Sequence, residues 1–339
     1  MRRISFILLL IVGVANADES PLFVSEDPID ITIKLPLQTI IRKAEDRPVV
    51  DATATYETGA GQPVSLPVQI STRGKSRLRE CQFPPLSFQV TKKNSAGTIF
   101  EGQKSLKLVA HCRSSAMFRS YVLQELGIYR AFNVLTDVSF RARQLNIRYE
   151  DTEKSGRILE EMGFFIEPIR EVASRNGLQR QKVATTSISQ HDPAYAALTS
   201  MFQFLIGNTD WSVVKAPPGD NCCHNGRVLS APDASDGWLV VPYDFDQTGI
   251  INARYAAPVP QLGIRSVRQR LWRGRCVHND QLDAVIEKFN EQREALELAL
   301  MPDGMKDEKS AQRYIDAFYD IINDSKRLNK QILEKCLAG

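Results

Sequence analysis

The chain has 339 residues, of which 43% are hydrophobic and 24% are charged, and these are the proportions of an ordinary globular protein. Its length is enough for a large hydrophobic core in one or two domains. The formal net charge of +3 gives no sign of the strongly basic surface that nucleic-acid or anionic-lipid binding requires. We therefore expect no nucleic-acid partner.

The first 17 residues have the pattern of a cleavable signal peptide. Arg2 and Arg3 form a short basic segment, an apolar run follows over 6–14, and Ala-Asn-Ala at 15–17 is a small-x-small cleavage motif. A retained membrane anchor is the alternative, but a membrane span needs about 20 apolar residues. We predict a periplasmic or secreted protein with no membrane span after cleavage.

The sequence up to residue 110 is typical of a strand-rich region. Alternation and apolar runs predict strands at 29–43, 67–72, 86–91 and 105–110. A basic loop between the second and third strands contains Arg73, Lys75, Arg77 and Arg79. This loop is either solvated or binds phosphate through charge-assisted hydrogen bonds.

Helices become more frequent toward the C-terminus. A helix capped by Ser114 or Ser115 is predicted to run to about Phe132, and Glu125 lies on its apolar face or at the solvent edge of that face. Strands are then predicted at 139–149, 162–169 and 238–243, and helices at 193–206, 280–300 and 308–335. This order predicts an α+β fold with a strand-rich N-lobe over 18–170 and a helical C-lobe over 171–339.

Two segments carry acidic residues directly after apolar elements. Asp210 follows the helix that stops at Gly207, Asn225 comes later in the same loop, and Asp244 and Asp246 follow a buried-type strand. Rigid elements hold such residues at the rim of a cleft. Asp and Asn supply the oxygen ligands that Mg²⁺ prefers, and phosphoryl transfer uses this combination. The alternative is that these residues are helix caps and turn residues.

The region from Val68 to Gly249 resembles the spore-coat-protein-H-like (CotH) kinases and is more distantly similar to HipA-type toxin kinases. The resemblance is carried by Arg-Gly-Lys-Ser at 73–76, Gly-Asn-Thr-Asp at 207–210 and Pro-Tyr-Asp-Phe-Asp at 242–246. It implies a two-lobed protein-kinase-like fold. It also implies that ATP and Mg²⁺ are used to phosphorylate a hydroxyl of an unidentified protein or small-molecule acceptor.

The resemblance also implies roles for individual residues. The expected site residues are Asp210 as catalytic residue, Asn225, Asp244 and Asp246 as metal ligands, and Lys107, Glu125, Arg73 and Lys75 for cofactor binding. Among the last group, Lys107 is expected to contact phosphate and Glu125 to be its ion-pair partner.

The sequence departs from the kinase pattern in three respects. An insertion over 213–224, which includes Pro217-Pro218-Gly219, lengthens the route from Asp210 to Asn225. Asn225 therefore reaches the cleft only if the insertion loops out. The sequence contains no glycine-rich phosphate loop, and the periplasm holds little ATP. The alternative function is a non-catalytic, pseudokinase-like envelope protein that binds a ligand or partner.

Six cysteines follow the predicted cleavage site: Cys81, Cys112, Cys222, Cys223, Cys276 and Cys336. An even number in an exported protein predicts disulfides, and six cysteines allow 15 full pairings. We expect Cys276 to pair with Cys222 or Cys223. A zinc site that also uses His224 and His278 is the alternative, but adjacent cysteines do not match the usual ligand spacing.

Overall fold

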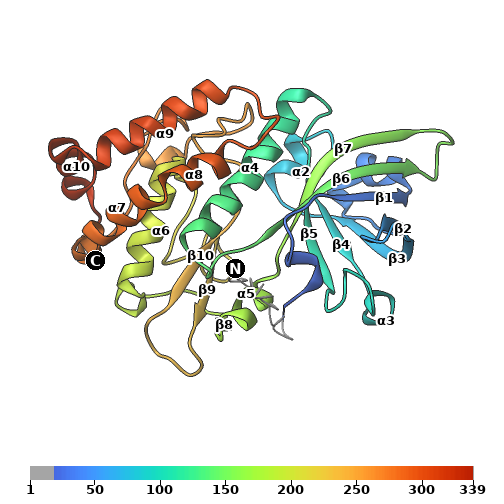
Figure 1. The fold of residues 1–339 in the computed structure, drawn as a ribbon, viewed down its shortest axis with the longest axis horizontal. Coiled ribbons are helices and arrows are strands. Elements are labelled where there is room, and N and C mark those ends of the chain that lie inside the picture. The colour runs from blue at the N-terminus through green and yellow to red at the C-terminus, as the bar shows by residue number, and fades with distance from the viewer. Residues whose placement is uncertain (1–18, 339) are drawn as a thin grey trace, which may run out of the picture.

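The computed structural model describes residues 19–338, so the predicted signal peptide lies outside the described residues. Seven strands form a closed barrel, and a second, smaller sheet lies beside the helices in the other half of the molecule (Figure 1). The barrel strands are β1 (Ile29–Leu35), β2 (Val49–Glu57), β3 (Pro63–Thr72), β4 (Leu86–Gln89), β5 (Ser105–Ala110), β6 (Ala142–Asp151) and β7 (Ile158–Ile166). Their order is β1-β2-β3-β4-β5-β7-β6.

The second sheet has the strand order β10-β9-β8. Its strands are β8 (Gln179–Gln181), β9 (Gly226–Ser230) and β10 (Leu239–Pro242). The α-helices are α1 (Leu37–Arg42), α2 (Ser76–Glu80), α3 (Lys92–Ser95), α4 (Ala116–Leu135), α5 (Ile169–Arg175), α6 (Pro193–Ile206), α7 (Leu282–Glu291), α8 (Arg293–Leu300), α9 (Glu308–Ile322) and α10 (Ser325–Gln331). None of the described helices is both long enough and apolar enough to cross a bilayer.

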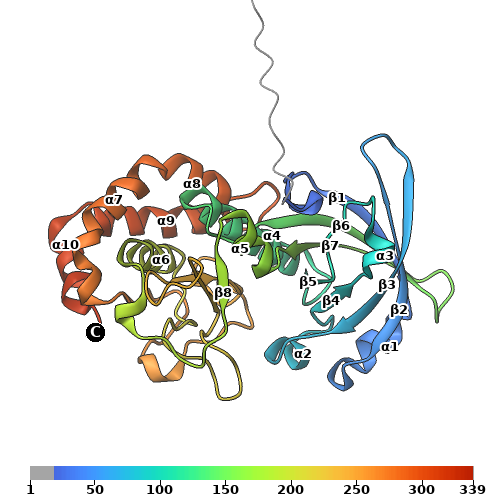
Figure 2. The ribbon, with the colours of Figure 1, turned by 90° about the horizontal axis from the view of Figure 1, so that it is seen from below.

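The prediction of a two-lobed, protein-kinase-like fold is wrong, although the chain does combine strands and helices. β1 pairs in parallel with β6, with Ile31 opposite Ile147, and this pairing closes the sheet into a mixed barrel. A closed barrel removes the open edges that a separate N-lobe sheet would have. In addition, α4 packs against α8, so a helix expected in the N-lobe belongs to the C-terminal core (Figures 1 and 2).

Two large hydrophobic cores meet at β7. Consecutive strand residues point to opposite faces, so Phe165 lies in the core of the barrel while Phe164 joins the core built on α4 and α6. Phe132 of α4 and Phe202 of α6 pack in that second core with ring centroids 4.6 Å apart. The shared strand therefore joins the barrel to the helices. Phe245, between Asp244 and Asp246, belongs to the core on the helical side of β7.

Local sequence signals predicted several elements correctly. The hydroxyl of Ser115 accepts a hydrogen bond from the Phe118 amide and caps α4, and α6 covers the predicted residues 193–206. The strand predicted over 29–43 ends at Leu35, because Pro36 follows and α1 begins directly after it. The sequence patterns did not predict β2, β8 or β9.

The cysteines form three disulfides: Cys81–Cys112, Cys222–Cys223 and Cys276–Cys336. The prediction of disulfides is confirmed, but the predicted pairing of Cys276 with Cys222 or Cys223 is wrong. Cys276 instead ties the segment before α7 to the C-terminal end of the described chain. Every cysteine is paired, so none is a free thiolate for the alternative zinc site.

Gly207 provides a test of how the acidic segment after α6 is held. Its φ of 66° is left-handed, and an added Cβ would overlap the hydroxyl of Tyr314. We expect Gly207→Ala to lower the free energy of unfolding by about 2–4 kcal/mol, through backbone strain plus overpacking. Gly177→Ala is the matched control, because Gly177 also has a left-handed φ but no atom within 4 Å of the added Cβ. It should cost about 1–2 kcal/mol. Equal losses in urea denaturation would contradict the packing argument.

Candidate functional site

Asp210, the predicted catalytic residue, lies in the turn that follows α6. Its amide donates a hydrogen bond to Oδ1 of Asn208, at 2.9 Å. Arg273 donates to the carbonyl oxygens of Thr209 and Trp211, each at 2.6 Å. Hydrogen bonds therefore hold the backbone on both sides of Asp210, which fixes the position of its half-buried carboxylate.

Asn225 returns to Asp210 after the insertion over 213–224, as expected if the insertion loops out. The Ser212 amide donates to the carbonyl oxygen of His224 at 3.1 Å and closes the base of the loop. Nδ2 of Asn225 then donates to the carbonyl oxygen of Asp210 at 2.7 Å and to its Oδ2 at 3.0 Å. Both hydrogen bonds use Nδ2, and no residue within 19–338 donates to the amide oxygen of Asn225, so this oxygen can bind another ligand.

His224 is a second partner of Asp210, and the sequence analysis considered it only as a zinc ligand. Its Nε2 lies 2.7 Å from Oδ1 of Asp210. This hydrogen bond raises the pKa of His224, while partial burial opposes the increase. Asp210 is thus oriented through both carboxylate oxygens, one by an imidazole and one by an amide.

Asp244, the second residue after β10, has an unusual backbone conformation. Its φ is 68° and that of Asn225 is 50°, in a region that residues other than glycine rarely adopt. Such conformations concentrate at functional sites. The amide of Asp244 donates to the hydroxyl of Tyr129 at 3.0 Å. Within the described part of the chain, no side chain donates a hydrogen bond to the carboxylate of Asp244, so this carboxylate remains available to a ligand.

Arg77, Glu125 and Asp246 form a buried charged cluster. Nη1 of Arg77 lies 4.0 Å from Glu125, and its Nε lies 4.0 Å from Asp246. Burial, and to a smaller extent repulsion from Asp246, raises the pKa of Glu125 to about 8. Burial, and to a smaller extent repulsion from Asp244, raises the pKa of Asp246 to about 6. Two acids share one cation here, so we infer that one of them keeps its proton near neutrality.

The expected ion pair between Lys107 and Glu125 is not formed among the described residues, because Arg77 is the partner of Glu125. Burial opposes the charge of Arg77, but Tyr255, Asp246 and Glu125 together raise its pKa. Its Nη2 also donates to the carbonyl oxygen of Ala110 at 2.6 Å. Arg77 is therefore a buried structural cation and not part of a solvated loop.

Lys107 lies instead beside Tyr243, with its Nζ 4.0 Å from the ring centroid. Burial lowers the pKa of Lys107 to about 7, repulsion from Arg73 and Arg227 contributes, and Asp244 opposes the decrease. Burial also lowers the pKa of Arg73, again opposed by Asp244. Both cations are thus electrostatic neighbours of Asp244.

Lys75, the remaining predicted site residue, is not part of this group. Its exposed ammonium pairs with Asp220 of the insertion at 2.9 Å.

Magnesium is the metal that the sequence resemblance implies, and the donor set fits it in part. No group of three or more His, Cys, Asp or Glu side chains suited to a metal occurs within residues 19–338. However, Mg²⁺ takes few protein ligands and completes its shell with water and phosphate. Asp244 and Asp210 both raise the pKa of Asp246 by repulsion. A cation held by Asp244 and the amide oxygen of Asn225 would relieve that repulsion.

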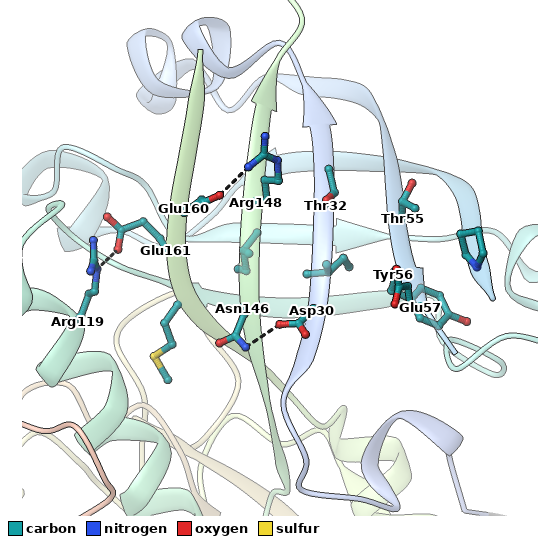
Figure 3. Close-up of a pocket in the computed structure, with 14 residues that line it drawn as sticks. Asp30, Thr32, Thr55, Tyr56, Glu57, Arg119, Asn146, Arg148, Glu160 and Glu161 are labelled. Carbon is teal, nitrogen blue, oxygen red and sulfur yellow. Dashed lines mark hydrogen bonds and ion pairs between the residues drawn. The ribbon is translucent and has the colours of Figure 1, made fainter. Parts of the chain in front are cut away.

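A separate pocket of about 540 Å³ lies on β1, β2, β6 and β7 of the barrel and contains none of the predicted site residues (Figure 3). Its two arginines are both ion-paired, and Arg119 contacts Glu161 at 2.8 Å. Arg148 contacts Glu160 at 2.6 Å, and Asn146 donates to Asp30 at 2.8 Å. The lining carries four carboxylates and two arginines, so this pocket does not suit an anionic ligand such as a phosphate compound.

No model of a known protein family matches the chain, and no curated protein matches it. The resemblance to the CotH kinases therefore stays a prediction.

The buried cluster predicts a pH-dependent effect of removing Arg77. The raised pKa values of Glu125 and Asp246 mean that the folded chain binds more protons than the unfolded chain. Their contribution to stability is thus fully present below about pH 4 and is lost as the pH rises to about 8. Arg77→Gln raises both pKa values further, so we expect it to cost roughly 3–5 kcal/mol at pH 8 and less at pH 5.

Urea denaturation at the two pH values measures this effect. Arg79→Gln is the control, because Arg79 is an exposed arginine of the same helix. Equal losses for Arg77→Gln at pH 5 and pH 8 would show that the acids do not titrate as a cluster.

Proposed function

We propose that this protein transfers a phosphoryl group from ATP to a hydroxyl of a protein or small-molecule acceptor, with Mg²⁺ as the metal. One observation supports this most strongly. Asp210 and Asn225, 15 residues apart, are hydrogen-bonded to each other, and Asp244 lies beside the cations Arg73 and Lys107. A hydroxyl-orienting acid, metal ligands and phosphate-binding cations are the groups that phosphoryl transfer requires.

In this proposal Asp210 orients the acceptor hydroxyl and accepts its proton. The hydroxyl oxygen forms a bond to the γ-phosphorus, and the bond from that phosphorus to the bridging oxygen breaks, so ADP leaves. Asn225 and His224 hold the two carboxylate oxygens of Asp210, so little reorganisation is needed before the proton moves.

The cofactor residues have separate tasks. Asp244 and Asn225 hold Mg²⁺, which when bound neutralises charge on the phosphate oxygens. Lys107 and Arg73 contact the phosphates directly. Glu125 acts indirectly, because it balances Arg77, which in turn faces Asp246.

Two further features agree with the proposal. The sequence resemblance to the CotH kinases implies the same reaction, and three disulfides suit an exported protein in an oxidising compartment.

A non-catalytic, pseudokinase-like binding protein is the second candidate. The contact between His224 and Oδ1 of Asp210 favours it, because a carboxylate engaged at both oxygens is less available to a hydroxyl proton.

Substitution of the two aspartates separates these candidates. We expect Asp210→Asn and Asp244→Asn each to reduce phosphoryl transfer by about 100-fold or more, since each amide keeps the shape of the side chain but removes its charge. Asp210→Asn should leave the binding of Mg·ATP nearly unchanged, whereas Asp244→Asn should weaken it.

Autophosphorylation and ATP hydrolysis with ³²P-labelled ATP measure transfer, and calorimetry measures binding. Asp233→Asn is the control, because Asp233 is exposed and, like Asp244, has a positive φ, of 59°. If the wild type binds Mg·ATP but releases and transfers no phosphate, the binding role replaces the catalytic one.

A further inference from the structure

The second sheet places two arginines and a tyrosine on one face. Arg180 of β8 lies opposite Leu229 of β9, and Arg227 of β9 lies opposite Val241 of β10. Residues directly opposite each other, and residues two apart on a strand, share a face of a sheet. Arg180 and Arg227 therefore lie on the same face, and Tyr243, two residues beyond Val241, continues it. The guanidinium of Arg227 lies 4.4 Å from the centroid of the Tyr243 ring.

The barrel brings further cations to the same tyrosine. Lys107 of β5 places Nζ 4.0 Å from the ring centroid of Tyr243. Arg73, just after β3, donates through Nε to the carbonyl oxygen of Leu86 at 3.1 Å, and it is close enough to Lys107 to lower its pKa. Cations from two separate sheets thus gather around one aromatic ring.

The positive charges of this group are not compensated by ion pairs. Within the described part of the chain, no carboxylate lies within ion-pair distance of Arg73, Lys107, Arg180 or Arg227, in contrast to the paired arginines of the barrel pocket. Repulsion from Arg227 adds to burial in lowering the pKa of Arg180. Bringing like charges together costs free energy, and a bound polyanion would recover it.

We propose that Arg180 and Arg227, together with Arg73 and Lys107, bind a chain of phosphate groups, so that the phosphate chain is the part of the phosphoryl donor that these cations recognise. That the bound phosphate chain belongs to a phosphoryl donor rests on the proposed function, whereas its binding by these cations does not. Four cations spread over two sheets suit several linked phosphates better than a single one. A nucleoside triphosphate and inorganic polyphosphate both present this chemistry.

Calorimetry on the mature chain with ATP, inorganic tripolyphosphate and AMP, each with Mg²⁺, tests the proposal. We expect ATP and tripolyphosphate to bind with dissociation constants within about tenfold of each other, and AMP to bind at least tenfold more weakly. Tripolyphosphate as the tighter ligand identifies inorganic polyphosphate as the source, and ATP as the tighter ligand identifies the nucleotide. Equal binding of AMP and ATP, or binding of ATP without tripolyphosphate, would overturn the proposal.

Variants locate the binding. Arg180→Gln and Arg227→Gln should each weaken both phosphate-chain ligands about tenfold, the effect of losing one charge-assisted hydrogen bond. Arg180→Lys and Arg227→Lys should restore part of this loss, and thermal unfolding checks that every variant is folded. Arg265→Gln is the control, because Arg265 is exposed and has no ion pair among the residues that the structure describes, and this variant should bind as the wild type does.

The results also separate this inference from the proposed function. Wild-type affinity in Arg180→Gln and Arg227→Gln, with binding lost in Asp244→Asn, would contradict only the role of the two arginines. No binding of either phosphate compound by the wild type would contradict both.

Discussion

The guanidinium of Arg77 connects three parts of the chain that are distant in sequence. It extends from α2, donates to the carbonyl oxygen of Ala110 at the end of β5, and faces Glu125 of α4 and Asp246 beyond β10. Buried charges are tolerated only when each has its partners, and removal of one partner is strongly destabilising. This one cation therefore links the barrel to α4 and to the acidic segment that contains Asp244 and Asp246.

The site that results has an acidic and a basic side. On the first, Asp246 is repelled by Asp244 and Asp210, and on the second, Lys107 and Arg227 approach Tyr243. On each side, like charges lie close together, which costs free energy. A metal ion with attached phosphates would place its positive charge beside the aspartates and its negative charges beside the cations. We infer that such a ligand stabilises the folded chain when it binds.

The features that the sequence predicted correctly have local causes. Capping by Ser115, the end of α6 at Gly207 and the looped insertion before Asn225 all follow from residues near one another in the chain. The errors concern distant partners. Nothing in β1 indicates a parallel pairing with β6, the partner of Cys276 lies 60 residues away, and Glu125 pairs with Arg77 across 48 residues. Arg180 and Arg227 were missed because no motif marks them, and only the strand register brings them together.

The most direct test is a crystal structure of the protein with Mn²⁺ and a non-hydrolysable ATP analogue, because manganese replaces magnesium and is located by its anomalous scattering. We predict one manganese peak between the carboxylate of Asp244 and the amide oxygen of Asn225. We also predict that the phosphate chain of the analogue extends toward Lys107. A manganese peak elsewhere, or an analogue bound away from Asp244, would contradict the account.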